Sequence, residues 1–256
     1  MRRIRLIVAY DGTGYVGWQV QPNGVSIQYH LERALYELTG EQIRVEGSGR
    51  TDSGVHAKAQ VAHFDTGVRM AADKFAIAMN MHLPPDIRVL YSEECDPSFH
   101  ARFSAKQKQY EYTVQIGAHA DVFHRLTSLH LHYVPDFAAM QIAAKAVIGT
   151  HDFAAFKCSD STMENTTRTI MQSEWVKNGS LWTYRVTGNG FLYNMVRILV
   201  GTMLEIGSGK RPANDMKHAL EARDRSLAGA TAPAHGLCLV RVCYPDFDTE
   251  EVLSRE

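Results

Sequence analysis

The chain has 256 residues, which is enough to bury a large hydrophobic core. Its hydrophobic fraction of 45% and its net charge of −1 are those of an ordinary soluble globular protein, and no apolar run is long enough to span a membrane. The apolar run before Asp11 is too short for a signal peptide and lacks a cleavage site. We therefore expect a cytoplasmic protein. Its four cysteines have neither metal-ligand nor disulfide spacing and are predicted to be buried thiols: Cys95, Cys158, Cys238 and Cys243.

Six elements are predicted in the first half of the chain. The first helix carries apolar residues at helical spacing and ends at Gly40. In order, the elements are a strand at Arg2–Tyr10, a helix at Ser26–Thr39, strands at Gln42–Glu46 and Gln60–Phe64, a helix at Ala71–Met81 and a strand at Ile87–Ser92. This βαββαβ order is the split-βαβ arrangement of ferredoxin-like domains.

The second half repeats this order loosely. Its elements are a strand at Lys108–Ile116, a helix at Asp136–Ile148, a hairpin of Arg168–Lys177 and Leu181–Thr187 about Asn178-Gly179, helices at Phe191–Ile206 and Asn214–Arg223, and a strand at Leu237–Tyr244. We predict an α+β fold of two ferredoxin-like halves, with largely antiparallel sheets side by side and a central active-site cleft. The expected divisions are an N-terminal half at 1–100, a C-terminal half at 101–245 and an acidic tail at 246–256, which is a candidate for disorder.

One segment is more specific than any other, the run Gly47-Ser-Gly-Arg50-Thr-Asp52-Ser-Gly-Val-His-Ala57. It joins glycine turns to a neighbouring cation and anion, and its residues do not look selected to fill a core. Glycines on both sides of Arg50 and Asp52 permit backbone angles that let a loop hold these charges close to a ligand. For an arbitrary stretch of this composition, a solvated surface turn is the simpler interpretation.

This run resembles the signature of the TruA-type tRNA pseudouridine synthases, whose catalytic aspartate occupies the place of Asp52. Five further blocks resemble the same family in the same order. They are Asp11–Gln21, Phe99–Ala105 with Tyr110–Tyr112, Gly149–Phe156, Asn189–Arg197 and Gly236–Leu239. Six ordered blocks between residues 11 and 239 make the resemblance very specific.

The resemblance implies the isomerisation of uridine to pseudouridine at positions 38, 39 and 40 of the tRNA anticodon arm, with base flipping. It implies a homodimer whose partner is the anticodon stem-loop of tRNA, with no cofactor and no metal. Cutting the bond between uracil and ribose and rejoining the base through carbon needs a nucleophile, and an ionised carboxylate suits this task. Asp52 is the candidate, attacking either ribose C1′ or uracil C6.

Arg197 and Tyr110 are the other catalytic candidates. The helix around Arg197 is apolar almost all round and is expected to be buried, so its guanidinium needs an anion or must reach solvent along its stem. In the family the matching arginine pairs with the aspartate, and such a partner lowers a carboxyl pKa by about 1–3 units. Tyr110 lies on the apolar face of its strand, where a core tyrosine is the plain interpretation. The family places it against the uracil, as a stacking surface and a proton-transfer group.

Three more residues are predicted to bind substrate. The resemblance suggests that Arg50 displaces the flipped base or holds a phosphate, and that Leu237 forms an apolar pocket wall; a surface arginine and core packing explain them equally well. Arg102, with Lys106 and Lys108, could form a local cationic cluster near the Arg50 loop, or simply a solvated strand edge. Local clustering matters because the last eleven residues hold five acids and one arginine, which leaves only +3 on the rest.

Two other classes of function compete with this one. Gly12-Thr-Gly14-Tyr-Val-Gly17 matches the dinucleotide fingerprint G-x-G-x-x-G after a strand, but Pro22 follows where a Rossmann helix should run, so an NAD-dependent oxidoreductase is a distant alternative. The other is a non-catalytic tRNA-binding protein of the same fold, against which the presence of Asp52, Tyr110 and Arg197 argues. A hydrolase triad at Ser53 and His56 is discounted because no G-x-S-x-G elbow exists. No third metal ligand accompanies the strand histidines of His130-Leu-His132.

Overall fold

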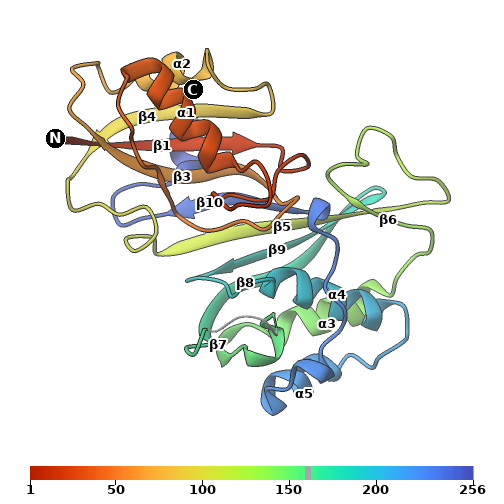
Figure 1. Ribbon diagram of the computed structural model, residues 1–256. Coiled ribbons are helices and arrows are strands. Elements are labelled where there is room, and N and C mark those ends of the chain that lie inside the picture. Colours follow the sequence, from red (N-terminus) through yellow and green to blue (C-terminus); the bar gives the residue numbers. More distant parts are fainter. Residues whose placement is uncertain (159–162, 256) are drawn as a thin grey trace. The chain divides into compact units, whose positions relative to one another are not determined.

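A computed structural model describes residues 1–158 and 163–255. The chain folds into two units, the first formed by Met1–Lys106 with Cys238–Glu256 and the second by Gln107–Leu237. Each unit combines a largely antiparallel sheet with helices, which confirms the α+β class (Figure 1). Within residues 1–158 and 163–255 none of the four cysteines forms a disulfide, and each is half-buried, not fully buried as predicted. In the described part of the chain no helix is long and apolar enough to cross a bilayer.

The first unit has the predicted βαββαβ order. Its elements are β1 (Arg2–Tyr10), α1 (Ile27–Thr39), β2 (Glu46–Gly47), β3 (His56–Thr66), α2 (Lys74–Asn80) and β4 (Ile87–Cys95), joined later by β10 (Leu237–Cys243) and α6 (Thr249–Leu253). β1 pairs antiparallel with both β4 and β3. β2 pairs antiparallel with β3 at Ala62 and His63, whereas β10 runs parallel to β3 at His56 and Ala57.

Local sequence explains helix α1. Ser26 caps its start, because the Ser26 side chain accepts a hydrogen bond from the Tyr29 N–H, and Gly40 ends it in a left-handed conformation with φ of 74°. Leu31 and Leu35, one helical turn apart, are fully buried. The apolar stripe that predicted the helix is therefore also the stripe that holds it in the core.

The predicted strand at Gln42–Glu46 shrinks to the two residues of β2. The reason lies at Val45, whose backbone groups are used by α1 instead of by β3. Gln28 Nε2 donates to the Val45 carbonyl (3.1 Å), and Glu32 Oε1 accepts from the Val45 N–H (3.0 Å). Side chains from a helix thus replace ladder hydrogen bonds that a longer strand would have made.

The second unit contains β5 (Gln107–Ile116), β6 (Leu129–Leu131), α3 (Phe137–Lys145), β7 (Gly149–Asp152), β8 (Thr167–Asn178), β9 (Leu181–Gly188), α4 (Met195–Gly207) and α5 (Asp215–Ala222). β5, β9, β8 and β7 pair antiparallel in that order, and β6 adds a parallel pairing to β5. The predicted hairpin is present, but Asn178 pairs with Leu181, so its two-residue turn is Gly179-Ser180. Helices α3 and α4 pack against each other (Figure 1).

Helix α4 begins at Met195, four residues later than predicted. Asn194 precedes it with φ of 61°, a left-handed conformation that asparagine tolerates better than most residues and that a helix cannot pass through. The residues of α4 itself are nearly all buried, as the all-round apolar pattern predicted.

The acidic tail is held by arginines of the first unit. The Arg241 guanidinium contacts Asp248 (2.5 Å) and Glu250 (2.9 Å), and Arg5 lies 3.5 Å from Asp246. The Asp248 side chain also caps the start of α6 by accepting from the Glu250 N–H. These ion pairs neutralise Arg5 and Arg241, which would otherwise contribute to the positive charge of the surface.

Candidate active site

The loop that carries Asp52 joins β2 to β3 and is anchored by buried polar side chains. The Ser48 hydroxyl lies 2.5 Å from Gln60 Oε1, and Gln60 Nε2 donates to the Gly49 carbonyl at 2.9 Å. Further along, the hydroxyls of Thr51 and Tyr10 are hydrogen-bonded at 2.8 Å. Burial raises the pKa of Tyr10, which therefore stays protonated. Thr51, the residue just before Asp52, is thus held by a side chain of β1.

The glycine-rich segment after β1 forms a platform for this loop. The Trp18 N–H donates to the Thr51 carbonyl at 3.1 Å, and the Gly54 N–H donates to the Tyr15 carbonyl at 3.3 Å. The Ser53 hydroxyl donates to the same Tyr15 carbonyl at 3.1 Å. Hydrogen bonds therefore reach the loop on both sides of Asp52. The segment Asp11–Gln21 in this way supports the run Gly47–Ala57.

Two glycines allow this close approach. A Cβ at Gly17 would lie 2.5 Å from the Thr51 carbonyl oxygen, and the backbone there has φ of +104°. A Cβ at Gly12 would lie 2.1 Å from the Val55 carbonyl oxygen, whereas one at Gly14 would meet nothing within 4 Å. Packing within the protein therefore explains Gly12 and Gly17, the first and last glycines of the G-x-G-x-x-G match, which weakens the support for a dinucleotide site.

The charged residues of the loop differ in exposure. Asp52 is half-buried, and its carbonyl accepts from the Val55 N–H at 3.1 Å, which closes a tight turn. Arg50 is exposed and forms no ion pair within the part of the chain that the structure describes. His56 Nδ1 faces the Gly12 N–H (3.0 Å) and Asp11 (3.1 Å), so neighbouring backbone and carboxylate set its orientation. With the Ser53 hydroxyl bonded to backbone, the geometry does not build a Ser–His pair.

In the second unit, Tyr110 lies on β5 with 9% of its surface exposed. Its ring meets Phe191 edge-on, with centroids 5.2 Å apart and planes at 87°. Two residues further on, the Tyr112 hydroxyl donates to the Pro233 carbonyl at 2.9 Å. On this strand, Tyr110 therefore packs against an aromatic ring, and Tyr112 is hydrogen-bonded to the segment that precedes β10.

Arg197 on α4 is half-buried and bound at several points within its own unit. Its Nε donates to the Ala232 carbonyl at 2.8 Å, and its Nη1 donates to Asn194 Oδ1 at 2.9 Å. The Ala232 N–H in turn donates to the Arg197 carbonyl at 3.1 Å. The left-handed Asn194 is thus explained, because it brings an amide oxygen back to the guanidinium. Arg197 is oriented by these contacts and is not a side chain extended freely into solvent.

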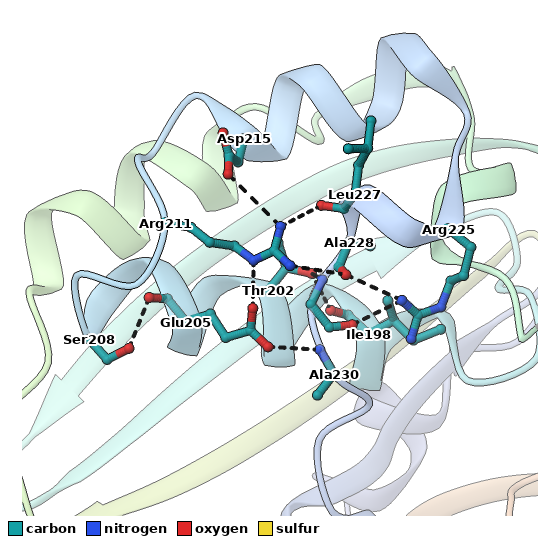
Figure 2. Close-up of polar contacts among 11 residues, drawn as sticks. Ile198, Thr202, Glu205, Ser208, Arg211, Asp215, Arg225, Leu227, Ala228 and Ala230 are labelled. Atoms are coloured by element: carbon teal, nitrogen blue, oxygen red, sulfur yellow. Dashed lines mark hydrogen bonds and ion pairs between the residues drawn. The ribbon is translucent and has the colours of Figure 1, made fainter.

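Part of the segment 227–236, which we call the strap, is hydrogen-bonded to side chains of α4, as Figure 2 shows for Ala230. Glu205 accepts from the Ala230 N–H (2.9 Å) and from Arg211 Nε (2.5 Å), while Thr202 accepts from the Gly229 N–H (2.8 Å). Burial acts to raise the Glu205 pKa, but these donors hold it below its ordinary value, so the carboxylate is charged. The clamp ends two residues before Ala232, whose carbonyl receives Arg197.

The predicted substrate-binding residues lie in both units, with Tyr110 and Leu237 in the second, which ends at Leu237. Arg50 and Arg102 belong to the first unit and are exposed, whereas Leu237 is 5% exposed and is the first residue of β10. Glu205 and Arg211 could not be recognised from the sequence, because an acid and a base six residues apart are common on any surface. No cluster of three or more His, Cys, Asp or Glu residues suited to a metal occurs in residues 1–158 and 163–255.

Comparison with known proteins gives one consistent result. The family model described as tRNA pseudouridine synthase matches residues 6–104 and 143–245. A tRNA pseudouridine synthase A of Halalkalibacterium halodurans is 49% identical over 93% of this chain and 90% of its own length. Proteins of the same name from Shouchella clausii and Geobacillus sp. (strain WCH70) are each 47% identical over 95% of this chain, and over 94% and 98% of their own lengths. The chain therefore belongs to the tRNA pseudouridine synthase family.

Proposed function

We propose that this protein converts uridine to pseudouridine in tRNA, at positions 38, 39 and 40 of the anticodon arm. The observation that carries the proposal is the identity of 44–49% to proteins named tRNA pseudouridine synthase A across nearly their whole length. Supporting it, the segment after β1 is hydrogen-bonded to the loop that carries Asp52, and Gly12 and Gly17 permit this close approach.

In the proposed reaction the Asp52 carboxylate is the nucleophile, at ribose C1′ or at uracil C6. The bond between N1 and C1′ breaks, the base turns, a bond forms between C5 and C1′, and the bond to Asp52 breaks so that the carboxylate is restored. The hydrogen on C5 leaves as a proton, and N1 gains a proton, so the product is an isomer of the substrate. No redox equivalent is consumed. The fixed loop favours this chemistry because a preoriented carboxylate loses little entropy on reaching the reacting carbon.

Arg197 and Tyr110 are proposed to assist. The family resemblance makes Arg197 the cation that keeps Asp52 negative, and the contacts to Ala232 and Asn194 support a guanidinium held in one orientation. Tyr110 is proposed to stack on the uracil, and the edge-on contact with Phe191 supports a ring that does not rotate. Stacking on an aromatic ring is worth about 1–3 kcal/mol, comparable to the cost of unstacking a base.

The remaining assignments follow from the same resemblance. Arg50, exposed beside Asp52, is proposed to displace the flipped base or to hold a phosphate, and Leu237 to contact the uracil as an apolar wall. The active species is proposed to be a cytoplasmic homodimer in which two chains bind one tRNA. Two copies would double a sparse set of exposed cations, which a chain of net charge −1 needs in order to bind RNA.

Tritium release from tRNA carrying 5-labelled uridine tests the activity, because isomerisation must expel that hydrogen. We expect release from a transcript with uridines at positions 38–40 and none from a matched transcript with cytidines there. Binding of tRNA without release would instead identify a non-catalytic tRNA-binding protein. Release from the cytidine transcript would show that the enzyme modifies other positions.

A further inference from the structure

An exposed aromatic side chain stands in a loop that is otherwise firmly held. Phe103 has 75% of its surface exposed, and its neighbours Arg102 and Lys106 are exposed as well. A large exposed phenyl ring has no role in the core of this unit. The loop at 97–106, which we call the display loop, lies wholly within the first unit.

Buried polar groups fix the backbone of the display loop. The Ala101 N–H donates to His63 Nδ1 (3.2 Å), and the Tyr244 hydroxyl donates to the Ala101 carbonyl (2.6 Å). His100 Nδ1 lies 3.1 Å and 3.4 Å from the N–H groups of Arg102 and Phe103. Two buried side chains therefore hold Ala101 just before the exposed stretch, and the Lys106 N–H donates to the Cys243 carbonyl (2.8 Å) at its far end, so the phenyl ring is presented with little conformational freedom to lose on binding.

The ring is backed by two imidazoles. Phe103 and His100 have centroids 4.3 Å apart with planes at 40°, and His100 and His63 follow at 4.8 Å. His63 is 5% exposed, and burial together with the nearby Arg3 lowers its pKa to about 4, so it is neutral at physiological pH. The three rings contact one another at tilted angles, with the planes of His100 and His63 at 60°, and the phenyl group is the outermost of them. Its exposed face is available to one more flat group, such as a nucleobase.

The cations beside the ring are available for an anion. Most arginines near this region are occupied, since Arg3 pairs with Asp65, and Arg44 with Glu46. Arg102 and Lys106, by contrast, form no ion pair with any residue that the structure describes. The Arg102 guanidinium lies 5.6 Å from the Phe103 centroid, near the outer limit of a cation–π contact, so turning it toward a phosphate costs little.

We propose that Phe103 is a stacking platform for an unpaired base of the bound tRNA, and that Arg102 contacts the phosphate next to that base. The inference rests on the proposed function only in taking tRNA as the ligand. A protein partner is less suited to the site, because aromatic rings interleaved with unpaired cations are the chemistry of single-stranded nucleic-acid binding. This platform is separate from the uracil-stacking role proposed for Tyr110.

An exposed indole at position 103 provides a direct test. The chain has three tryptophans, Trp18, Trp175 and Trp182, and none is more than 6% exposed. In Phe103→Trp the added fluorescence therefore comes from an exposed indole, which a stacked base quenches. Tyr36→Trp is the matched control, because Tyr36 is 54% exposed on α1 in a setting where the nearby Arg33 is already paired with Glu37.

We expect tRNA to quench the added indole of Phe103→Trp and not that of Tyr36→Trp. Phe103→Ala should weaken tRNA binding about 5- to 150-fold, and Phe103→Leu should not restore it, because an alkyl chain cannot stack. Arg102→Gln should reduce the slope of log affinity against log salt by about one. Wild-type affinity in Phe103→Ala, or an unquenched indole at saturating tRNA, would overturn the proposal.

Two further outcomes are distinguishable. If the Phe103→Trp indole becomes shielded when protein concentration rises without tRNA, the ring contacts a second copy of the chain and the platform is refuted. If the unsubstituted protein itself fails to bind tRNA, the proposed function fails, and Phe103 is not the cause.

Discussion

Replacing Gly17 with alanine tests whether the platform positions Asp52. At φ of +104° an L-residue is strained, at a cost of about 1–3 kcal/mol. The new Cβ would also lie 2.5 Å from the Thr51 carbonyl oxygen, where ordinary contact begins at 3.4 Å, so the Asp52 loop must move by about 1 Å. A displacement of that size at a catalytic group can reduce the rate about 10²-fold.

Thermal melts and single-turnover tritium release measure the two effects. The strain alone should lower the melting temperature by roughly 2–12 °C, at about 2–4 °C per kcal/mol for a protein of this size. Gly14→Ala is the matched control, because a Cβ there meets nothing within 4 Å and the backbone needs no positive φ. It should leave both stability and rate nearly unchanged. If Gly17→Ala turned over at the wild-type rate, the platform would not position the nucleophile.

Three other changes probe separate parts of the structure. Tyr110→Phe keeps the ring that packs on Phe191, so an unchanged rate would leave stacking as its role and remove the hydroxyl from the mechanism. Arg197→Ala leaves the Ala232 carbonyl without its side-chain donor. We expect it to lower the free energy of unfolding by about 1–3 kcal/mol and to suppress turnover as well. A variant with wild-type melting temperature and wild-type rate would exclude the pairing with Asp52. For His63, burial lowers the pKa in the folded state from 6.5 to about 4. As the pH falls, the unfolded chain therefore binds a proton at His63 before the folded protein does. Stability should then decrease as the pH drops from about 6.5 to about 4. Urea unfolding across that range should show a shallower loss for His63→Gln than for the wild type.

Sequence patterns predicted the elements of the fold well where a single face decides the structure. The apolar residues of α1 lie on one face only if the segment is a helix. The alternating residues of β5 share one face only if the segment is a strand. The failures occurred where a tertiary contact replaced a local preference. Gln28 and Glu32 take the backbone groups of Val45 from the expected strand, and Asn194 stops the helix before Met195 in order to reach Arg197. Neither contact leaves a periodic trace in the sequence.

The candidate site residues remain predictions, and the contacts that hold them could not be predicted from the sequence. Asp52 was selected because glycines and charges stand together in one run that resembles the family signature. The spacing of Gly12 and Gly17 was misleading, because it also matches the dinucleotide-binding fingerprint. The structure shows that these glycines permit a close approach to the backbone of Val55 and Thr51. The strap depends on Glu205 accepting from a backbone N–H 25 residues away, a pairing that side-chain identities alone do not indicate.

The most direct test of the central claim is single-turnover tritium release by Asp52→Asn, measured with a parallel determination of tRNA affinity. Asparagine preserves the size of the side chain and removes the negative charge and the nucleophilic oxygen. We expect tRNA binding close to wild type and a rate reduced by at least about 10³-fold, as when a nucleophile is deleted. Tritium release at a rate near that of the wild type would show that another group performs the reaction.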